Sequence, residues 1–202
     1  MKKRIITIGR KYGSGGHIVG KLLARKLDLP YYDKELLFLA ARKGNLAEEK
    51  FLKFDEKPTN FFLYQVNYSG NEHVNPGESM EDTLYHLQEK TILEIGGTGP
   101  AVIVGRWADA ILEKAGYEVL SVFIDAPLEY RIDRIMLLEG WKHDKAKKLI
   151  KKLDKRRKNY YESHTGKKWG DMSSYHLYFD CSKYVSYEDI ANQIIRFYQG
   201  TT

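Results

Sequence analysis

Residues 5–17 read IITIGRKYGSGGH, and this stretch decides the fold. Residues 5–8 form a short, β-branched apolar run, which is typical of a strand buried on both faces. Glycines follow it directly, and over 18–27 apolar residues recur on one face of a helical pattern. Glycines let the backbone approach a ligand closely, and a helix N-terminus adds partial positive charge. The sequence therefore predicts a phosphate-binding loop rather than a plain structural turn.

This loop lacks two side chains that phosphate-binding loops usually carry. The usual pattern ends in Gly-Lys-Ser or Gly-Lys-Thr, with the lysine on the β- and γ-phosphates and the hydroxyl on Mg²⁺. Here Gly16 stands at the lysine position, and no Ser or Thr follows it. Arg10, Lys11 and Lys21 are cations that could reach a phosphate from another direction. Lys21 lies more than a turn into the predicted helix and is more simply a solvated surface residue.

Strand and helix patterns alternate along the rest of the chain. Further strands are predicted at 29–32, 101–104, 119–124 and 175–179. Helices are predicted at 34–42, 79–95, 107–114, 127–139, 142–158 and 186–197. This alternation predicts an α/β fold of three layers, with a five-stranded parallel sheet covered on both faces. Ligands of such sheets bind at the carboxyl ends of the strands. The residues that matter most are then 9–16, Asp33, Arg106, Asp125 and Asp180.

The charge of the chain is concentrated in one segment. Lys and Arg total 33 against 27 Asp and Glu, a net charge of +6. Residues 142–158 hold ten basic and two acidic side chains, so this segment carries +8 and the remainder −2. Its apolar residues at 146, 149, 150 and 153 are spaced as one face of a helix. The pattern indicates a local anionic partner for an amphipathic basic helix.

Cysteine content and hydropathy exclude several classes of protein. Cys181 is the one cysteine, which excludes an internal disulfide and a site of several cysteine ligands. No apolar run reaches the ~18 residues of a membrane span. The basic residues 1–4 precede an apolar run too short for a signal peptide, so we expect a cytoplasmic protein that does not bind membranes.

The chain resembles the cytidylate kinase-like family, a branch of the nucleoside monophosphate kinases with the P-loop kinase fold. Four stretches carry the resemblance, in order: IITIGRKYGSGGHIVGKLLARKLDLPYYDKELL, VIVGRWADAIL, VFIDAPLEYRIDRI and DKRRKNYYESHTGKKWGDMSSYHLYFD. The resemblance implies one domain over 1–202, with an acceptor-side segment at 45–78 and a lid at 140–174. It also implies transfer of the γ-phosphate of ATP, with Mg²⁺, to a nucleoside monophosphate such as CMP or dCMP.

Roles follow from the resemblance residue by residue. The residues expected to bind the ATP phosphates are Arg10, Gly13, Ser14, Gly15, Gly16, His17, Arg131 and Arg134. Those expected on the acceptor side are Asp33, Arg106, Asp154 and Arg157. Asp33, Arg106 and Arg157 are the expected catalytic residues, and no set of metal ligands is assigned.

Several of these residues also have structural interpretations. A single glycine separates Arg106 from the preceding strand, so its planar guanidinium could bind phosphate bidentately or form a structural ion pair. Asp33 could hold Mg²⁺ or join the acceptor's hydrogen bonds, but it could equally cap the next helix. Arg157 continues the apolar face of its helix and should point inward, with Asp154 one turn before it. The other cations of that helix are more simply a solvated face.

Two alternative functions remain open on the sequence. Val104 stands where cytidylate kinases have an acidic residue, which with the missing lysine favours a weak or inactive nucleotide-binding or regulatory protein of the same fold. A nucleic-acid binder acting through 142–158 is the second alternative, although we expect nucleotides rather than nucleic acid as partners. Aromatic residues at 45–68 make a homodimer conceivable.

Overall fold

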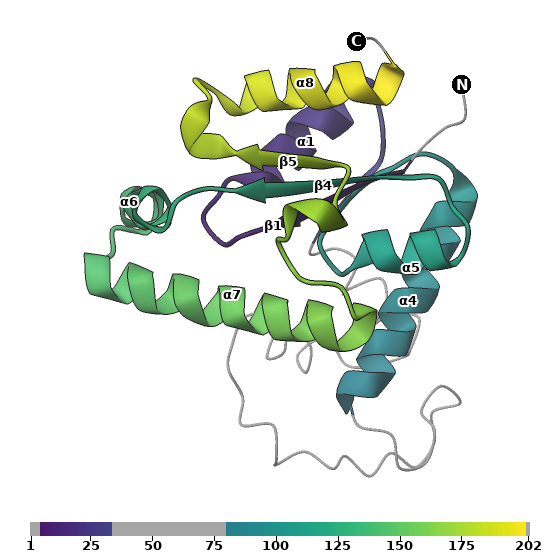
Figure 1. The fold of residues 1–202 in the computed structure, drawn as a ribbon, viewed down its shortest axis with the longest axis horizontal. Coiled ribbons are helices and arrows are strands. Elements are labelled where there is room, and N and C mark those ends of the chain that lie inside the picture. Colours follow the sequence, from purple (N-terminus) through teal and green to yellow (C-terminus); the bar gives the residue numbers. More distant parts are fainter. Residues whose placement is uncertain (1–4, 34–79, 201–202) are drawn as a thin grey trace. The chain divides into compact units, whose positions relative to one another are not determined.

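A computed structural model describes residues 5–33 and 80–200 of this 202-residue chain, and Figure 1 shows their arrangement. The predicted helix at 34–42, the acceptor-side segment at 45–78 and the aromatic residues at 45–68 lie outside the described residues. The chain divides into two compact units, residues 1–33 with 99–202 and residues 34–98. The first unit contains the sheet, and the second contains helix α4 (Met80–Thr98).

A five-stranded parallel sheet forms the centre of the first unit, as predicted. The strands are β1 (Ile5–Arg10), β2 (Tyr31–Tyr32), β3 (Val102–Val104), β4 (Val119–Asp125) and β5 (Leu177–Asp180). Their order is β2-β3-β1-β4-β5. Ile6 is level with Val102 of β3 and Leu120 of β4. All five strands run the same way, so the segments that follow β1, β2 and β3 meet at one edge.

Helices cover both faces of this sheet (Figure 1). Helices α1 (Gly16–Leu27) and α8 (Tyr187–Gln199) pack together on one face. Helices α5 (Ala108–Lys114) and α7 (His143–Thr165) lie on the other, and α6 (Leu128–Glu139) packs against α7. The core lies mainly between the sheet and the α1–α8 layer, where Ile6, Leu23 and Ile190 are fully buried. Three layers confirm the predicted fold class.

The starts of α6 and α8 agree with local signals in the sequence, whereas the ends of α7 and α4 do not. Pro127 immediately precedes α6, and Ser186 and Asp189 form the capping box that starts α8. Helix α7 runs to Thr165, well beyond the predicted 158. Tyr161 is buried there, and Gly166 then ends the helix in the left-handed conformation. Helix α4 likewise continues through the predicted stop at Gly96 and Gly97 to Thr98. Of the helices in the described ranges, none combines the length and the apolar character that a bilayer crossing requires.

Candidate functional site

The loop between β1 and α1 has the conformation expected of a phosphate cradle. Gly13 and Gly15 have φ angles of 83° and 90°, the left-handed region that favours glycine. A Cβ atom on Gly15 would also lie 2.3 Å from the ring of Tyr187. Glycine is thus required at residue 15 by conformation and by space, and α1 begins at the next residue.

Backbone amides of this loop are available to an anion. The N–H of Tyr12 donates to Asp154, and that of Ser14 lies 3.3 Å from the carbonyl oxygen of Lys11. By contrast, the amides of Gly13, Gly15, Gly16 and His17 donate no hydrogen bond within 5–33 and 80–200. Because they gather at the positive end of a twelve-residue helix, they form a site suited to phosphate.

Ser14 stabilises this loop through hydrogen bonds of its buried hydroxyl. Its side chain is fully buried, and its hydroxyl donates to the carbonyl oxygens of Lys11 and Ile124, at 2.9 Å and 3.0 Å. This hydroxyl fastens the loop to β4, and the predicted contact of Ser14 with phosphate stays a prediction.

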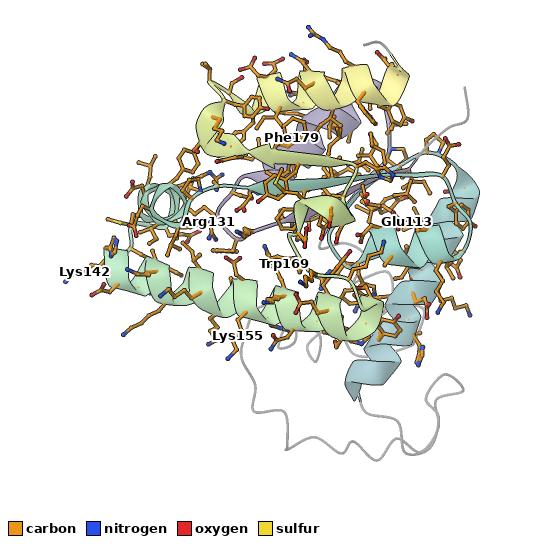
Figure 2. The ribbon with its side chains drawn as sticks, viewed as in Figure 1. Glu113, Arg131, Lys142, Lys155, Trp169 and Phe179 are labelled. Atoms are coloured by element: carbon orange, nitrogen blue, oxygen red, sulfur yellow. The ribbon has the colours of Figure 1, made fainter. Side chains whose placement is uncertain are left out.

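Arg131 and Asp154 tie the loop to helices α6 and α7. The Nη1 atom of Arg131 lies 2.6 Å from Oδ2 of Asp154 and 3.0 Å from the carbonyl oxygen of Tyr12. Asp154 also accepts a 2.8 Å bond from the amide of Tyr12. The Arg131 side chain is 6% exposed and lies between the two helices (Figure 2). This geometry ties the loop to both helices, and the predicted contacts of Arg131 with ATP and of Asp154 with the acceptor stay predictions.

Arg157 faces inward, as its place on the apolar face of α7 predicted. Its Nη1 donates to the carbonyl oxygen of Arg10 at 3.2 Å, and its guanidinium lies 5.5 Å from the ring centre of Tyr12. Burial lowers the pKa of Arg157 to about 9, and the charges of Arg10 and Arg106 add to this effect against Asp154 and Asp33. The side chain still carries its charge at neutral pH, so three guanidinium groups repel one another at this edge. A bound anion would relieve that repulsion.

Arg106 follows β3 in a strained turn. Arg106 and Trp107 have φ angles of 60° and 43°, which residues other than glycine rarely adopt. The centre of the Trp107 ring lies 4.1 Å from that of Tyr160 and 5.6 Å from that of His164, on which it stacks. Both partners come from α7. The C-terminal part of α7 thus holds the turn that presents Arg106.

Asp109 strengthens the same attachment, and the sequence analysis did not identify it. Its Oδ2 accepts a 2.8 Å bond from the hydroxyl of Tyr161, and both side chains are buried. Burial raises the pKa of the Asp109 carboxyl, against the hydrogen bond from Tyr161. One turn farther along α5, Glu113 forms a 2.6 Å ion pair with Lys167. No local pattern marks these contacts, because they join residues more than 50 positions apart in the sequence.

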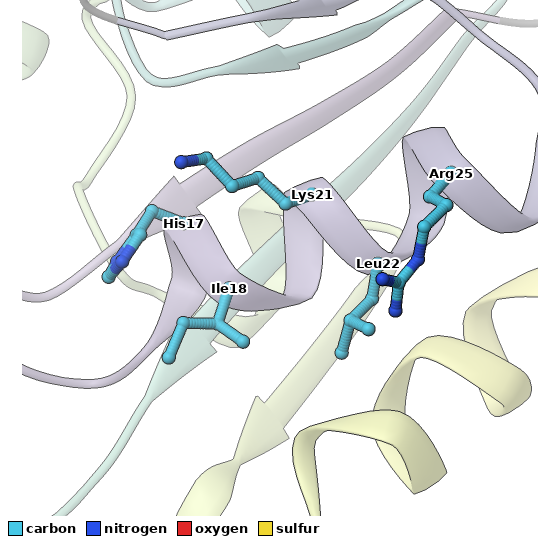
Figure 3. A pocket seen from close by; sticks show the side chains of 5 residues that line it. All are labelled: His17, Ile18, Lys21, Leu22 and Arg25. Atoms are coloured by element: carbon cyan, nitrogen blue, oxygen red, sulfur yellow. The ribbon is translucent and has the colours of Figure 1, made fainter.

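Two of the three cations considered as replacements for the loop lysine are placed elsewhere. The ammonium group of Lys11 lies 2.7 Å from Oδ2 of Asp125, which also accepts a hydrogen bond from Tyr178. Lys21 lines a surface hollow of about 240 Å³ on α1 (Figure 3), with its ammonium 5.9 Å from the ring centre of Tyr31. These contacts agree with the structural interpretation of Lys21 and give Lys11 a partner in β4.

His17 and Arg134 lie beside the loop, and Asp33 lies at the end of β2. Partial desolvation lowers the pKa of His17, and the charge of Arg134 lowers it further, so the imidazole is neutral at physiological pH. Arg134 lies 3.5 Å from the carbonyl oxygen of Gly13 and packs over the ring of Tyr187. Asp33 pairs with Arg10 at 3.1 Å and accepts from the hydroxyl of Tyr31 at 3.2 Å.

Most of this chain is similar in sequence to two known proteins. Cytidylate kinase of Methanocaldococcus jannaschii is 28% identical over 183 residues, 89% of each chain. Cytidylate kinase of Pyrococcus horikoshii is 25% identical over 184 residues, which is 90% of this chain and 82% of that one. Both relatives are thus similar across most of their length.

Solved structures extend the likeness in fold. The structure of an uncharacterized protein from Eubacterium ventriosum matches with a TM-score of 0.69 and 26% identity over 98% of this chain and 99% of that one. Shikimate kinase from Bacteroides thetaiotaomicron matches over 98% of each chain with a TM-score of 0.56, but at 15% identity it supports the fold alone. The family model described as "Cytidylate kinase-like family" matches residues 5–183. Since that match spans the sheet, the glycine loop and the arginines of α6 and α7, this chain belongs to the cytidylate kinase-like family.

Proposed function

We propose that this protein transfers the γ-phosphate of ATP to a nucleoside monophosphate of the CMP or dCMP class. One observation carries the proposal: the unbonded amides of the loop and the guanidinium groups of Arg10, Arg106 and Arg157 meet at the same edge of the sheet. A donor triphosphate needs the first group of contacts, and an acceptor phosphate needs the second. Membership of a kinase-like family supports a site with separate contacts for a donor and an acceptor phosphate.

Arg106 and Arg157 have the charge and position that the reaction requires. In phosphoryl transfer the bond from the γ-phosphorus to the β–γ bridging oxygen breaks, and a new bond forms to an oxygen of the acceptor phosphate. Negative charge spreads over the oxygens of the transferred group, so catalysis depends mainly on positioning and on fixed positive charge. The two guanidinium groups supply that charge with no proton transfer.

Asp33 and the loop are the elements that would hold MgATP. The loop amides suit a triphosphate, and Arg134 over Tyr187 offers a flat surface beside them. Mg²⁺ on nucleotides is bound through phosphate oxygens and one or two carboxylates. In the part of the chain that the structure describes, no three His, Cys, Asp or Glu side chains gather as a metal site. Asp33 is the carboxylate at the end of β2, and a lone pair not used by Arg10 or Tyr31 would be its ligand to Mg²⁺, which would supply charge neutralisation there.

The experiment that tests this function is a coupled assay of ADP release over a panel of monophosphates. We expect turnover that depends on the acceptor and is strongest with CMP or dCMP. Arg106→Ala should lower it by about 100-fold. Lys155→Ala is the matched control, because Lys155 lies on the exposed side of α7, turned away from the sheet (Figure 2). ADP release without dependence on the acceptor, or none despite tight ATP binding, would contradict the proposal.

A second candidate function is nucleotide binding without catalysis. Gly16 and Val104 favour it, because neither can supply the charge that lysine and aspartate give in the usual site. The same assay separates the two functions, since a binder would show ATP affinity in calorimetry and no turnover with any acceptor.

A further inference from the structure

The side chain of Arg10 occupies the space beside Gly16, where the usual phosphate loop has a lysine. A Cβ atom added to Gly16 would lie 2.6 Å from Cβ of Arg10 and 3.1 Å from its Cγ. Cβ atoms in proteins do not approach this closely. The stem of Arg10 therefore fills the volume in which a side chain of residue 16 would begin, and the two positions cannot both carry long side chains.

The guanidinium of Arg10 lies farther along the same edge of the sheet. A Cβ atom on Gly105, which follows β3 directly, would lie 1.8 Å from Nη1 of Arg10. Nη2 of Arg10 lies 3.1 Å from Oδ1 of Asp33, which follows β2. Since the strand order is β2-β3-β1, the side chain runs from the end of β1 past β3 toward β2. Gly16 and Gly105 together leave this path open.

The side chain of Arg10 lies close to both the donor side of the proposed site, at the loop, and the acceptor side, at Arg106. Its stem lies against the first residue of α1, and its guanidinium touches the residue just before Arg106. Its side chain is 17% exposed, so a ligand can contact it. Lys11 and Lys21, the other two cations considered as replacements for the lysine, face Asp125 and the hollow on α1. Arg10 is thus the loop cation whose placement matches the missing lysine.

We propose that Arg10 replaces the missing lysine and contacts donor and acceptor phosphates at once, which rests on the proposed function. A planar guanidinium can bind oxygens of two phosphate groups, whereas an ammonium acts as a point charge. The ion pair with Asp33 orients the fork toward the acceptor side. Arg10 neither gives nor takes a proton. It neutralises charge on the oxygens of the transferred group.

Moving the positive charge from residue 10 to residue 16 tests this inference. The variants are Arg10→Gly, Gly16→Lys and the double variant that carries both changes. Arg10→Gly should weaken MgATP binding at least tenfold and lower turnover at least 100-fold. Gly16→Lys should be impaired to a similar degree, because the new stem meets that of Arg10. The double variant has room for the lysine and should recover to within about tenfold of the wild type.

Controls keep a loss of folding apart from a loss of function. Thermal unfolding and circular dichroism of each variant report the fold, and Arg10→Lys tests charge without a change of backbone freedom. Lys21→Ala should bind and turn over like the wild type. The inference is overturned if Gly16→Lys alone matches the wild type, or if the folded double variant is no better than Arg10→Gly.

Binding of inorganic tripolyphosphate separates this inference from the proposed function. If the wild type binds tripolyphosphate but phosphorylates no monophosphate, the proposed kinase activity fails, and the role of Arg10 is judged from the binding of the three variants. If tripolyphosphate binds wild type and Arg10→Gly equally, the role of Arg10 fails while the kinase activity can stand. If the wild type binds no tripolyphosphate, the role of Arg10 fails, and the kinase activity is judged from acceptor-dependent turnover alone.

Discussion

The loop between β1 and α1 and the inner face of α7 both face the edge of the sheet where we propose that an anion binds, but they contribute different chemical groups. The loop offers backbone amides and a helix N-terminus, which no single side-chain substitution removes. Helix α7 contributes Arg157, whose pKa is lowered because burial and two other guanidinium groups oppose its charge. On this proposal, the shape of the loop suits it to a ligand, whereas α7 is suited by the unfavourable charge of its buried arginine.

The largest expected effect comes from removing charge on the α7 side alone. Arg157→Ala should lower kcat/KM for phosphoryl transfer by about 1,000-fold, because a cation near the transferred group acts mainly in the transition state. The affinity for MgADP should fall less than tenfold, since the loop amides remain. Steady-state kinetics and calorimetry measure the two quantities. Equal losses in both would show that loop and helix form one undivided site.

The next effect concerns the connection between the two regions. Asp154→Ala removes the partner of buried Arg131 and of the Tyr12 amide, and we expect it to lower the free energy of unfolding by about 3 kcal/mol. Asp144→Ala on the same helix is the matched control, because its side chain is 90% exposed. That variant should stay within about 0.5 kcal/mol of the wild type. Urea unfolding measures both, and similar values would contradict the support role.

A smaller, pH-dependent effect is expected where α7 holds the turn of Arg106. Burial raises the pKa of Asp109 in the folded protein above the unfolded value of 3.8. Its stabilising contribution is therefore complete below that value and is lost as the pH rises through the folded pKa. Tyr161→Phe removes a hydrogen bond that favours the charged carboxylate, so we expect a cost of about 2 kcal/mol above the folded pKa of Asp109 that shrinks as the pH falls through that pKa. Urea unfolding as a function of pH checks this, and a cost independent of pH would rule out Asp109 as its source.

The smallest effect is expected on the outer face of α7. Lys148, Lys151 and Lys155 are exposed, and their combined substitution by Gln should change kcat/KM by less than about threefold, since exposed charges contribute little. Binding of single-stranded RNA to this variant and the wild type, at two salt concentrations, tests the nucleic-acid alternative. Tight, salt-sensitive binding that the variant loses would favour that alternative over a nucleotide site.

Much of the fold could be predicted because its signals are local. The apolar run at 5–8, the glycines after it and the capping residues Ser186 and Asp189 each act within a few positions. The inward direction of Arg157 followed from the helical period in the same way. The end of α7 was missed although Tyr161 continues the same helical period one turn after Arg157, while its hydrogen bond to Asp109 of α5 joins positions that the period does not connect.

The candidate site was predicted less completely, because its supports join distant positions. Arg131 and Asp154 are 23 residues apart, Asp109 and Tyr161 are 52 apart, and Lys11 and Asp125 are 114 apart. Sequence reasoning identified Arg131 and Asp154 as ligand-binding candidates because they are charged residues in family motifs. Their mutual hydrogen bonds give them a role in holding the loop.

The α/β fold, the glycine loop and the family follow from the sequence alone, because periodicity, glycine positions and motif order are properties of neighbouring residues. Tertiary structure decided which charges meet. Only the packing of the strands beside one another shows that Arg10 fills the space beside Gly16 and reaches Gly105 and Asp33. Pairing between side chains depends on distance in space, and the strand order that sets these distances is not written in any one segment of the chain.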